Sequence, residues 1–225
     1  KKILNIIIPV LNSVDVLDIP LSSIIKQKKH NFELKILLVD SDSSDGIKDF
    51  VKKYKTILDI QIYNAGPCSI GQARNIGINN SNCDYVIFLD SDDALTTNRL
   101  YTDSNLIENN YLKKEIDFIF GNSIQIVRKN LKYSYENIVH KNPKFLQYLH
   151  IPYNLGSLTI NFKNLKKRKI SFEDGRLGED WKFTIDLSNK LSNSFLIDKP
   201  RIIINSRIGS HTQDKIQYQL SKNTF

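Results

Sequence analysis

The sequence contains no methionine and only two cysteines, Cys68 and Cys83. Because even an initiator methionine is missing, we expect that the chain was trimmed or that some residues are missing from its numbering. The two cysteines form neither a disulfide framework nor a CxxC pattern for a metal or for redox chemistry. We therefore expect buried thiols and a cytoplasmic, reducing environment.

Long hydrophobic runs are also absent. No apolar stretch approaches the roughly 20 residues that a membrane-spanning helix needs, and the Ile-rich N-terminal stretch is interrupted by Pro9. A chain of 225 residues in which 40% of the side chains are hydrophobic can still bury a substantial core. We expect a soluble protein that forms a single domain over residues 1–225.

Acidic residues are in deficit, since 24 Asp and Glu face 32 Lys and Arg, which gives a formal charge of +8. This excess indicates an anionic partner: nucleic acid, a membrane surface or a phosphate-bearing small molecule. The densest basic run, residues 166–169, has a solvated loop or helix face as its simplest interpretation, with contact to an anionic lipid or a charged acceptor as the alternative. Segments such as Lys132-Tyr133 match no nucleic-acid-binding signature, so we expect no nucleic-acid partner.

What the sequence does contain is a regular alternation of strand-like and helix-like segments. Four short apolar runs are typical of strands in a parallel sheet that is covered on both faces. They span residues 3–10, 34–39, 60–63 and 85–89. Apolar residues recur at helical spacing over residues 16–25, 47–54 and 70–78. Pro20 would have to lie in or near the first turn of its helix. These βαβ units predict a Rossmann-like α/β sheet with helices on both faces.

The second half of the chain is less regular. Residues 98–114 have a helical pattern, and residues 118–120 and 124–127 each predict a strand. We find neither a linker nor an internal repeat. We therefore expect one domain with a regular half, about residues 1–95, and a mixed half, about residues 96–225.

The densest acidic cluster, Asp90-Ser91-Asp92-Asp93, follows the apolar run 85–89. Carboxylates this close repel one another unless a cation or a proton compensates, and such oxygen-rich sites suit Mg²⁺ or Mn²⁺ bridging a diphosphate. The carboxyl end of a strand in an α/β sheet is also where ligands usually bind. The alternative is an acidic turn that caps the next helix.

A second acidic cluster, Asp40 to Gly46, follows the second predicted strand in the same context. The two strand ends should therefore face one crevice. Asp40 could accept hydrogen bonds from a base or a ribose, while residues 43–46 could turn the chain and cap the next helix. A calcium loop of the EF-hand type is excluded, because its twelfth position requires glutamate and this sequence has Val51 there.

Five motifs, taken in order, resemble those of the family 2 glycosyltransferases. They are Ile8-Pro9-Val10-Leu11-Asn12, Val39-Asp40 with Ser43 and Asp45-Gly46, Gly71-Gln72-Ala73-Arg74-Asn75, Phe88-Leu89-Asp90-Ser91-Asp92-Asp93 and Gly178-Glu179-Asp180-Trp181. Ser41 stands where a second acid is common and Leu11 where an aromatic is frequent, but neither departure removes a required chemical group. The resemblance implies the GT-A fold, with a nucleotide-binding first half and an acceptor-binding second half.

By that resemblance, the first half binds the nucleotide of a sugar donor. The implied contacts are Pro9, Asn12, Asp40, Arg74, Asp90, Ser91 and Asp92. Among them, Asp40 contacts the base and Arg74 approaches the base or a phosphate. The acidic cluster looks like the DxD motif, with Asp92 and Asp93 as the preferred pair for ribose and metal contact. Which carboxylate touches the metal stays open.

The same resemblance places the reaction in the second half. Asp180 resembles the catalytic base, which the chemistry requires because an acceptor hydroxyl must lose its proton as it attacks the anomeric carbon. Helix capping is the alternative role of Asp180. Glu179 would orient the acceptor, and Trp181 would form an apolar wall or belong to the core. Asp174 is a weaker candidate base.

Two residues near the C-terminus resemble a further part of the pattern, in which His211 completes the metal site and Arg207 meets the diphosphate. His30, His140 and His150 have no comparable context, so we expect them to be structural or surface residues.

Together these assignments predict an inverting glycosyltransferase. Mn²⁺ or Mg²⁺ would neutralise the departing diphosphate while Asp180 takes the proton of the nucleophile on the opposite face of the sugar. A UDP-sugar is the first choice of donor. The expected acceptor is a saccharide or glycolipid of the bacterial surface, and peripheral contact with the inner face of the plasma membrane is a hypothesis.

Two alternatives belong to other classes. A sugar-nucleotide nucleotidyltransferase also has an α/β sheet and acidic metal ligands, but its usual glycine-rich N-terminal loop is absent. A non-catalytic module could bind a nucleotide-sugar, or nucleic acid through the +8 charge. The intact Asp92, Asp93 and Asp180 argue against a decayed site.

Overall fold

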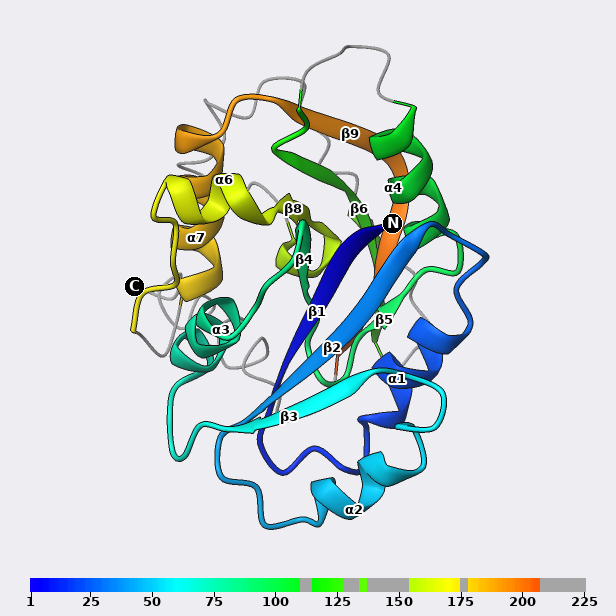
Figure 1. The fold of residues 1–225 in the computed structure, drawn as a ribbon, viewed down its shortest axis with the longest axis vertical. Coiled ribbons are helices and arrows are strands. Elements are labelled where there is room, and N and C mark those ends of the chain that lie inside the picture. Colours follow the sequence, from blue (N-terminus) through cyan, green and yellow to red (C-terminus); the bar gives the residue numbers. More distant parts are fainter. Residues whose placement is uncertain (110–114, 128–133, 137–153, 175–177, 207–225) are drawn as a thin grey trace, which may run out of the picture.

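The structure is a computed structural model that describes residues 1–109, 115–127, 134–136, 154–174 and 178–206. Its strands are β1 (Lys2–Val10), β2 (Phe32–Asp40), β3 (Ile60–Asn64), β4 (Tyr85–Phe88), β5 (Ala94–Leu95), β6 (Phe118–Val127), β7 (Ser134–Glu136), β8 (Thr159–Asn161) and β9 (Ser194–Ser206). Its helices are α1 (Asp18–Ile25), α2 (Ile47–Lys52), α3 (Ile70–Asn79), α4 (Arg99–Glu108), α6 (Phe162–Lys167) and α7 (Glu179–Lys190), with a 3-10 turn at Leu155–Ser157. One mixed sheet runs through them in the order β3-β2-β1-β4-β8-β6-β9-β5, with β7 beside β6 (Figure 1).

The first four strands are parallel to one another. β1 lies between β2 and β4, and β2 pairs with β3. Residues 4–10 of β1 and 36–40 of β2 are buried without interruption, as apolar runs covered on both faces should be. The strands and helices predicted for the first half are confirmed, and Pro20 lies in the first turn of α1.

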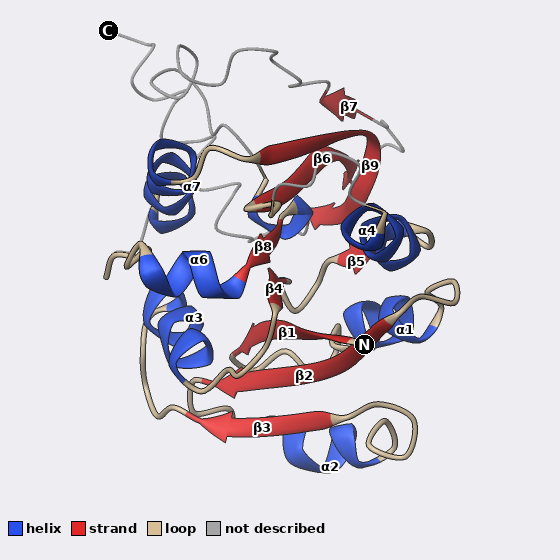
Figure 2. Cartoon of the chain, turned by 45° about the horizontal axis from the view of Figure 1, so that its top comes forward, coloured by secondary structure: helices blue, strands red, loops and turns tan. Residues whose placement is uncertain are grey.

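Helices cover both faces of this sheet. On one face, Ile6 and Ile8 belong to the same hydrophobic cluster as α1, α2 and α4. On the other face, Ile7 belongs to the cluster formed with α3, α6 and α7. Figure 2 shows the two groups of helices on opposite sides of the strands. The contact is close at Gly77 of α3, where a Cβ atom would lie 2.5 Å from Cγ2 of Ile7. The predicted α/β arrangement is therefore confirmed.

The second half extends the same sheet with mixed pairing. β8 is antiparallel to β4, β6 is antiparallel to β8, and β9 is parallel to β6. The helix predicted over residues 98–114 is observed as α4, and residues 110–114 lie outside the described part of the chain.

One strand prediction is wrong, because residues 118–120 and 124–127 are the two ends of the single strand β6. The pairing of β6 with β9 shifts register on both sides of Asn122. A Cβ atom at Gly121 would lie 2.4 Å from the backbone oxygen of Ile197, so a glycine is required where β9 approaches. This irregularity interrupts the apolar pattern without ending the strand.

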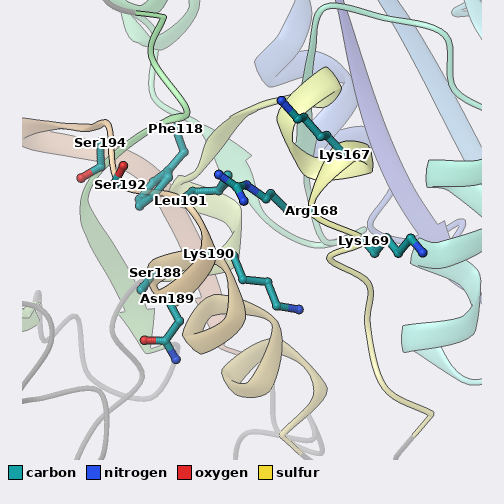
Figure 3. Close-up of a pocket in the computed structure, with 10 residues that line it drawn as sticks. All are labelled: Phe118, Lys167, Arg168, Lys169, Ser188, Asn189, Lys190, Leu191, Ser192 and Ser194. Carbon is teal, nitrogen blue, oxygen red and sulfur yellow. The ribbon is translucent and has the colours of Figure 1, made fainter.

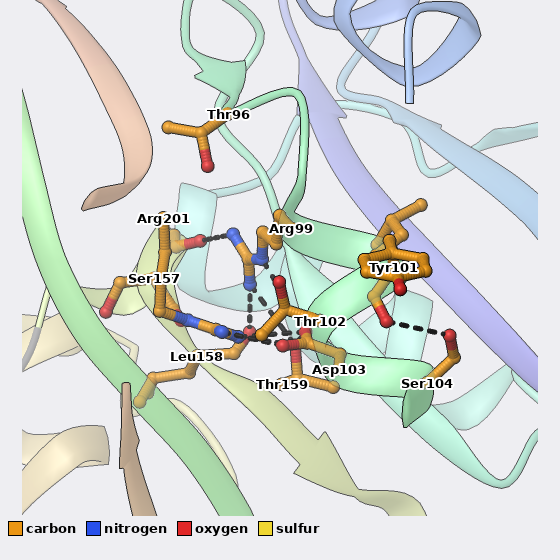
Figure 4. A network of polar contacts seen from close by, with 12 residues as sticks. Thr96, Arg99, Tyr101, Thr102, Asp103, Ser104, Ser157, Leu158, Thr159 and Arg201 are labelled. Atoms are coloured by element: carbon orange, nitrogen blue, oxygen red, sulfur yellow. Dashed lines mark hydrogen bonds and ion pairs between the residues drawn. The ribbon is translucent and has the colours of Figure 1, made fainter. Parts of the chain in front are cut away.

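A buried ionic network ties β9 and α4 to the segment before β8 (Figure 4). Arg201 of β9 donates to both carboxylate oxygens of Asp103 in α4, at 2.6 and 2.9 Å. Arg99 of α4 donates to the backbone oxygens of Gly156 and Leu158. The three charged side chains are at most 2% exposed. Burial, and then the neighbouring Arg201, lower the pKa of Arg99 well below its ordinary value. No sequence pattern predicted this network.

The composition-based expectations are met in part. Cys68 and Cys83 are free thiols, as expected, but both are half-buried rather than buried. Burial raises the pKa of the Cys83 thiol to about 12, so it is protonated at neutral pH. In the described ranges, no helix combines the length and the apolar character that crossing a membrane requires.

Candidate active site

Three loops meet at the carboxyl edge of the parallel strands. They follow β1, β2 and β4 and span residues 11–13, 41–46 and 89–93. Val10 pairs with Asp40 across β1 and β2, while Ile7 pairs with Phe88 across β1 and β4. The two acidic clusters therefore emerge at the same edge of the sheet, as the sequence predicts.

The loops after β1 and β2 are hydrogen-bonded to each other. The backbone N–H of Asn12 donates to Ser43 Oγ at 3.0 Å, and the N–H of Ser44 donates to the amide oxygen of Asn12 at 2.9 Å. The N–H of Val14 donates to the carboxylate of Asp45 at 2.8 Å. Asn12 has a φ of 46°, a conformation that asparagine tolerates better than most residues. Asn12 thus shapes an exposed loop, and its contact with a nucleotide stays a prediction.

Asp40 ends β2 and is 2% exposed. Its Oδ1 accepts a hydrogen bond from the N–H of Ser43 at 2.9 Å, so it forms the turn that the cluster was expected to make. The expected capping is not observed, because α2 has Gly46 at its N-cap with no side-chain cap. Pro9 is buried in the adjacent strand, opposite Val39. The contacts of Pro9 and Asp40 with a nucleotide stay predictions.

Arg74 of α3 joins two acidic segments that are far apart in the sequence. Its Nη2 donates to Oδ1 of Asp90 at 2.7 Å, and its Nη1 donates to Oε1 of Glu179 at 3.1 Å. The side chain is buried, and its guanidinium lies 5.3 Å from the ring centre of Phe172. One cation therefore holds the loop after β4 and the start of α7 together.

The electrostatics of Arg74 follow from these neighbours. Burial alone lowers the pKa of Arg74, but the charges of Asp90, Glu179 and Asp180 reverse this effect and raise it above its ordinary value. The contribution of Asp180 shows that all three carboxylates act on one guanidinium. The sequence analysis assigned Arg74 to the nucleotide and missed its two ion pairs. The available sign of these ion pairs was that one of the five motifs contains an arginine and three contain acids.

Helix α3, which carries Arg74, is positioned by its N-terminus. Ser69 and Gln72 form a reciprocal capping box there. The carboxylate of Asp174 accepts hydrogen bonds from Ser69 Oγ at 2.9 Å and from Gln72 Nε2 at 2.8 Å. A Cβ atom at Gly71 would lie 2.6 Å from the backbone oxygen of Glu173. Asp174, the weaker candidate base, therefore anchors the chain ahead of α7 to α3 through both of its oxygens.

The cluster after β4 divides into residues with different surroundings. The Asp90 side chain is 47% exposed and pairs with Arg74. Asp93 is 6% exposed, and its Oδ1 accepts a hydrogen bond from the N–H of Asn205 in β9 at 3.0 Å. The cluster leads into β5, so the alternative of an acidic turn that caps a helix is not observed.

The predicted metal site can be compared with the observed positions of these carboxylates. Among the described residues, no group of three His, Cys, Asp or Glu side chains could hold a metal ion. Mg²⁺ is commonly held by one or two carboxylates together with substrate phosphates. The described part of the chain offers no cage built from protein alone, and contact of Asp92 and Asp93 with a metal shared with a diphosphate stays a prediction. His211 and Arg207, the other predicted contacts, lie outside the described residues.

Helix α7 presents the second acidic motif. It begins at Glu179, directly after Gly178, which has a φ of 86°. Oδ1 of Asp180 accepts a hydrogen bond from the N–H of Trp181 at 2.8 Å, and acids in a first turn interact favourably with the helix dipole. Asp180 therefore stabilises the first turn, but the N-cap of α7 is Gly178 with no side-chain cap, so the alternative role of helix capping is not observed, and the role of Asp180 as a base stays a prediction. Trp181 is 41% exposed and does not belong to the core.

A mixed sheet with helices on both faces, and with acid-bearing loops at the carboxyl edge of its parallel strands, defines an α/β protein of the GT-A type. A sequence model described as Glycosyl transferase family 2 matches residues 5–168. The chain therefore belongs to this family, as its motifs predicted.

Individual relatives agree with this assignment. A glycosyltransferase of Rickettsia felis is 32% identical in an alignment 200 residues long that covers 84% of this chain and 30% of the relative. The chain spans about a third of the length of the rickettsial relatives it matches. The structure of S. aureus TarS 1-349 in complex with UDP-GlcNAc gives a TM-score of 0.76 at 20% identity, covering 93% of this chain and 60% of that one. The mannosyltransferase PcManGT from Pyrobaculum calidifontis, in complex with GDP-Man and Mn²⁺, gives 0.66 at 15% identity, covering 96% and 60%. The predicted GT-A fold is confirmed.

Proposed function

We propose that this chain carries the catalytic domain of an inverting glycosyltransferase that moves a sugar from a nucleotide diphosphate to an acceptor hydroxyl. The observation that carries the proposal is the position of Arg74, which binds Asp90 at 2.7 Å and Glu179 at 3.1 Å. The acidic edge of the sheet and the first turn of α7 thereby belong to one site. A donor bound at that edge would have Asp180, the residue after Glu179, close to its sugar.

Asp180 is the proposed general base. As the acceptor oxygen bonds to the anomeric carbon, the bond from that carbon to the phosphate oxygen breaks and the nucleoside diphosphate leaves with the electron pair. The proton of the acceptor hydroxyl passes to the carboxylate of Asp180. Attack from the face opposite to the leaving group inverts the configuration at the anomeric carbon.

Arg74 has a positioning role in this proposal. Carboxylates that share a small volume repel one another, and a fixed cation among them offsets that repulsion. Because the side chain of Arg74 is buried and binds two of the acids, it keeps the first turn of α7 against the loop after β4. The position of Asp180 relative to the donor site would then be fixed before any ligand binds. A catalytic group that is already in position lowers the barrier to the reaction.

Mn²⁺ or Mg²⁺, when bound, would supply the positive charge that stabilises a departing diphosphate. Asp92 and Asp93 are the proposed ligands, and Oδ1 of Asp93 also accepts a hydrogen bond from the N–H of Asn205. The complex of PcManGT with GDP-Man and Mn²⁺ supports this choice of metal.

The proposed donor and acceptor classes are supported by one complex of a structural neighbour and by one exposed side chain. The TarS complex with UDP-GlcNAc supports a UDP-sugar, of a hexose or an N-acetylhexosamine, as the first donor to test. Trp181 is 41% exposed one residue after Asp180 and offers an apolar face to a saccharide or glycolipid acceptor. We place that acceptor in the surface glycans of a bacterium.

Calorimetric titration of a UDP-sugar panel, with and without Mn²⁺, tests the donor site. Asp92→Asn should lose the metal-dependent part of the binding. Asp49→Asn is the matched control, since it removes a carboxylate on the exposed face of α2, and it should bind like the wild type. If no UDP-sugar binds, GDP- and dTDP-sugars come next. Failure of all nucleotide-sugars would reject the proposal in favour of a binding module of another kind.

A transfer assay with the donor found in this way tests the base. Asp180→Asn should keep donor affinity and lower turnover about 10²- to 10⁴-fold, the range for loss of a general base. Asp174→Asn is the comparison, because it alters the anchor of α3 and should lower turnover far less. Equal turnover of Asp180→Asn and the wild type would remove Asp180 from the chemistry.

A further inference from the structure

A polar cavity of about 850 Å³ lies between the ends of α6 and α7 and the start of β9 (Figure 3). Its polar wall includes Lys167, Arg168, Lys169, Lys190, Ser192 and Ser194. None of the described residues that line it is acidic. The cavity is lined by three of the four residues of the basic run 166–169. For this run the sequence left two interpretations open, a solvated face and a contact with an anion.

The charges in this cavity are poorly balanced by the protein. In the described part of the chain, Lys167, Arg168 and Lys169 make no ion pair with a carboxylate, and Lys190 lies 3.6 Å from Oδ2 of Asp186. That carboxylate also binds Lys182 at 2.8 Å. Several positively charged side chains therefore share a cavity that contains few negative charges.

The apolar floor of the cavity strengthens the attraction of its basic side chains for anions. Phe118 and Leu191 line it and are 1% and 4% exposed, so apolar groups back the basic rim. Figure 3 shows the guanidinium of Arg168 reaching from the end of α6 toward these two residues. A concave surface of one charge sign with low-dielectric walls concentrates counter-ions. Guanidinium, ammonium and serine hydroxyl groups are donors that suit the oxygens of a phosphate.

The backbone at Lys169 is the independent observation. Its φ is 51°, in the left-handed region, and its N–H donates to the backbone oxygen of Lys166 at 3.1 Å. The N–H of Ile170 donates to the oxygen of Leu165 at 3.2 Å, so α6 ends in a Schellman motif. This position normally favours glycine. The helix dipole explains lysines in the last turns of α6 and α7, but it does not explain a lysine at a position that disfavours side chains.

The cavity is separate from the candidate active site. Asp180 lies in the first turn of α7 and Lys190 is its last residue, and a helix of 12 residues is about 18 Å long. A ligand in this cavity would therefore not replace the donor.

We propose that this cavity is a second anion site, which binds a phosphate group through Arg168, Lys169 and Lys190. Two sources carry this chemistry, the headgroup of an anionic lipid and a soluble phosphate compound. The proposal does not depend on the transfer reaction, because it concerns a different end of α7.

Chemical-shift mapping on the ¹⁵N-labelled chain tests the site with inorganic pyrophosphate as the probe. The amides of residues 188–194 should shift, and Arg168→Gln with Lys190→Gln should weaken the affinity there roughly tenfold, as expected for charge-assisted hydrogen bonds. Lys48→Gln with Lys55→Gln is the control, because it removes two exposed positive charges around α2, which lies far from α6 and α7 in Figure 1. Shifts at the acidic edge report donor-site binding and are scored separately.

Co-sedimentation with phosphatidylcholine vesicles that contain phosphatidylglycerol tests the lipid source. Binding that is lost in the Arg168–Lys190 double variant and kept in the control assigns the phosphate to a membrane surface. Pyrophosphate shifts without vesicle binding assign it to a soluble compound. No effect at residues 188–194 from either probe, or equal losses in the two double variants, overturns the proposal.

Lys169→Gly separates ligand binding from a structural role. Removing the side chain should weaken pyrophosphate binding at residues 188–194 while raising the Tm, because glycine adopts the left-handed conformation without strain. A higher Tm with unchanged pyrophosphate affinity would show that Lys169 takes no part in the site.

Discussion

The two halves of the sheet are held together by different interactions. In the first half, β1 and β2 are buried on both faces by aliphatic side chains, which meet α1, α2 and α4 on one face and α3, α6 and α7 on the other. In the second half, α4, β9 and the segment before β8 meet around Asp103 and two arginines, all buried. Apolar burial needs a pattern along the chain, whereas a buried ion network needs particular partners from distant segments. We therefore expect substitutions in the two halves to destabilise different parts of the sheet.

Asp103→Asn should have the largest effect on stability. It leaves Arg99 and Arg201 buried without the one carboxylate that pairs with them in the described part of the chain, and breaking a buried pair in this way costs roughly 3–5 kcal/mol. Urea unfolding measures the loss. Hydrogen exchange should show it first in α4 and β9. Asp49→Asn, which removes an exposed partner of Lys52, is the control and should change little. If amides throughout the sheet, including those of β1 to β3, lose protection from hydrogen exchange equally, the two halves are not stabilised separately.

Leu38→Ala is the corresponding stability test for the first half. Leu38 is fully buried in β2, and shortening it should lower the free energy of unfolding by roughly 2–5 kcal/mol. The loss should not depend on salt, because no charge is involved. Hydrogen exchange should now increase in β1 to β3 before α4 and β9. If Leu38→Ala and Asp103→Asn loosen the same amides, the two halves unfold as one unit and the comparison fails.

Arg74→Gln tests the point where the two halves meet. Glu179 would lose its partner, and since hydrogen bonds to charged groups contribute about 1.5–3 kcal/mol, a stability loss in that range is expected. Turnover should fall further than donor affinity, because α7 and its Asp180 would no longer be held against the loop after β4. Arg74→Lys keeps the charge without the two-pronged geometry and should recover only part of the turnover. Equal losses of donor affinity and turnover would instead favour a direct contact of Arg74 with the nucleotide.

Asp84→Asn should have the smallest effect, at the opposite edge of the sheet. Burial raises the pKa of Asp84, but hydrogen bonds from the Ile3 N–H and the Lys2 ammonium lower it more, so the net pKa lies below the ordinary value. A carboxylate with a depressed pKa in the folded state stabilises at pH values above the ordinary 3.8 and loses this contribution as the pH falls through its folded value. At pH 7 the substitution should cost less than about 1 kcal/mol, because the side chain is 36% exposed and screened. Thermal melts from pH 7 down to pH 2 should show the difference from the wild type shrinking. A constant difference would show that the pair does not titrate in this way.

The first half was predictable because its structure is locally encoded. Each apolar run and the helix after it lie within a few tens of residues, and the buried side chains follow the period of their element. The second half defeated the same reasoning at Gly121, where the approach of Ile197 requires a glycine in the middle of β6. A pattern along one strand does not reveal which strand will lie beside it.

The candidate site divides in the same way. The residue types of the five motifs indicated the family and the acidic edge, and the structure places Asp40 and the cluster at Asp90 on that edge. The different surroundings of Asp90 and Asp93 could not be read from the sequence, because both are acids of one short cluster. Arg74 approaches Asp90 from α3, whereas Asn205 approaches Asp93 from β9.

By itself, the sequence determined the family, the parallel sheet with its flanking helices and the acidic character of one edge, because periodicity and motif order are properties of the chain alone. Only the tertiary structure decided that Arg74 joins Asp90 to Glu179, that Asp174 anchors α3 and that a basic cavity forms at the far end of α7. Each of these depends on side chains from segments distant in the sequence. Their energies come from distance and burial, which exist only once the chain has folded.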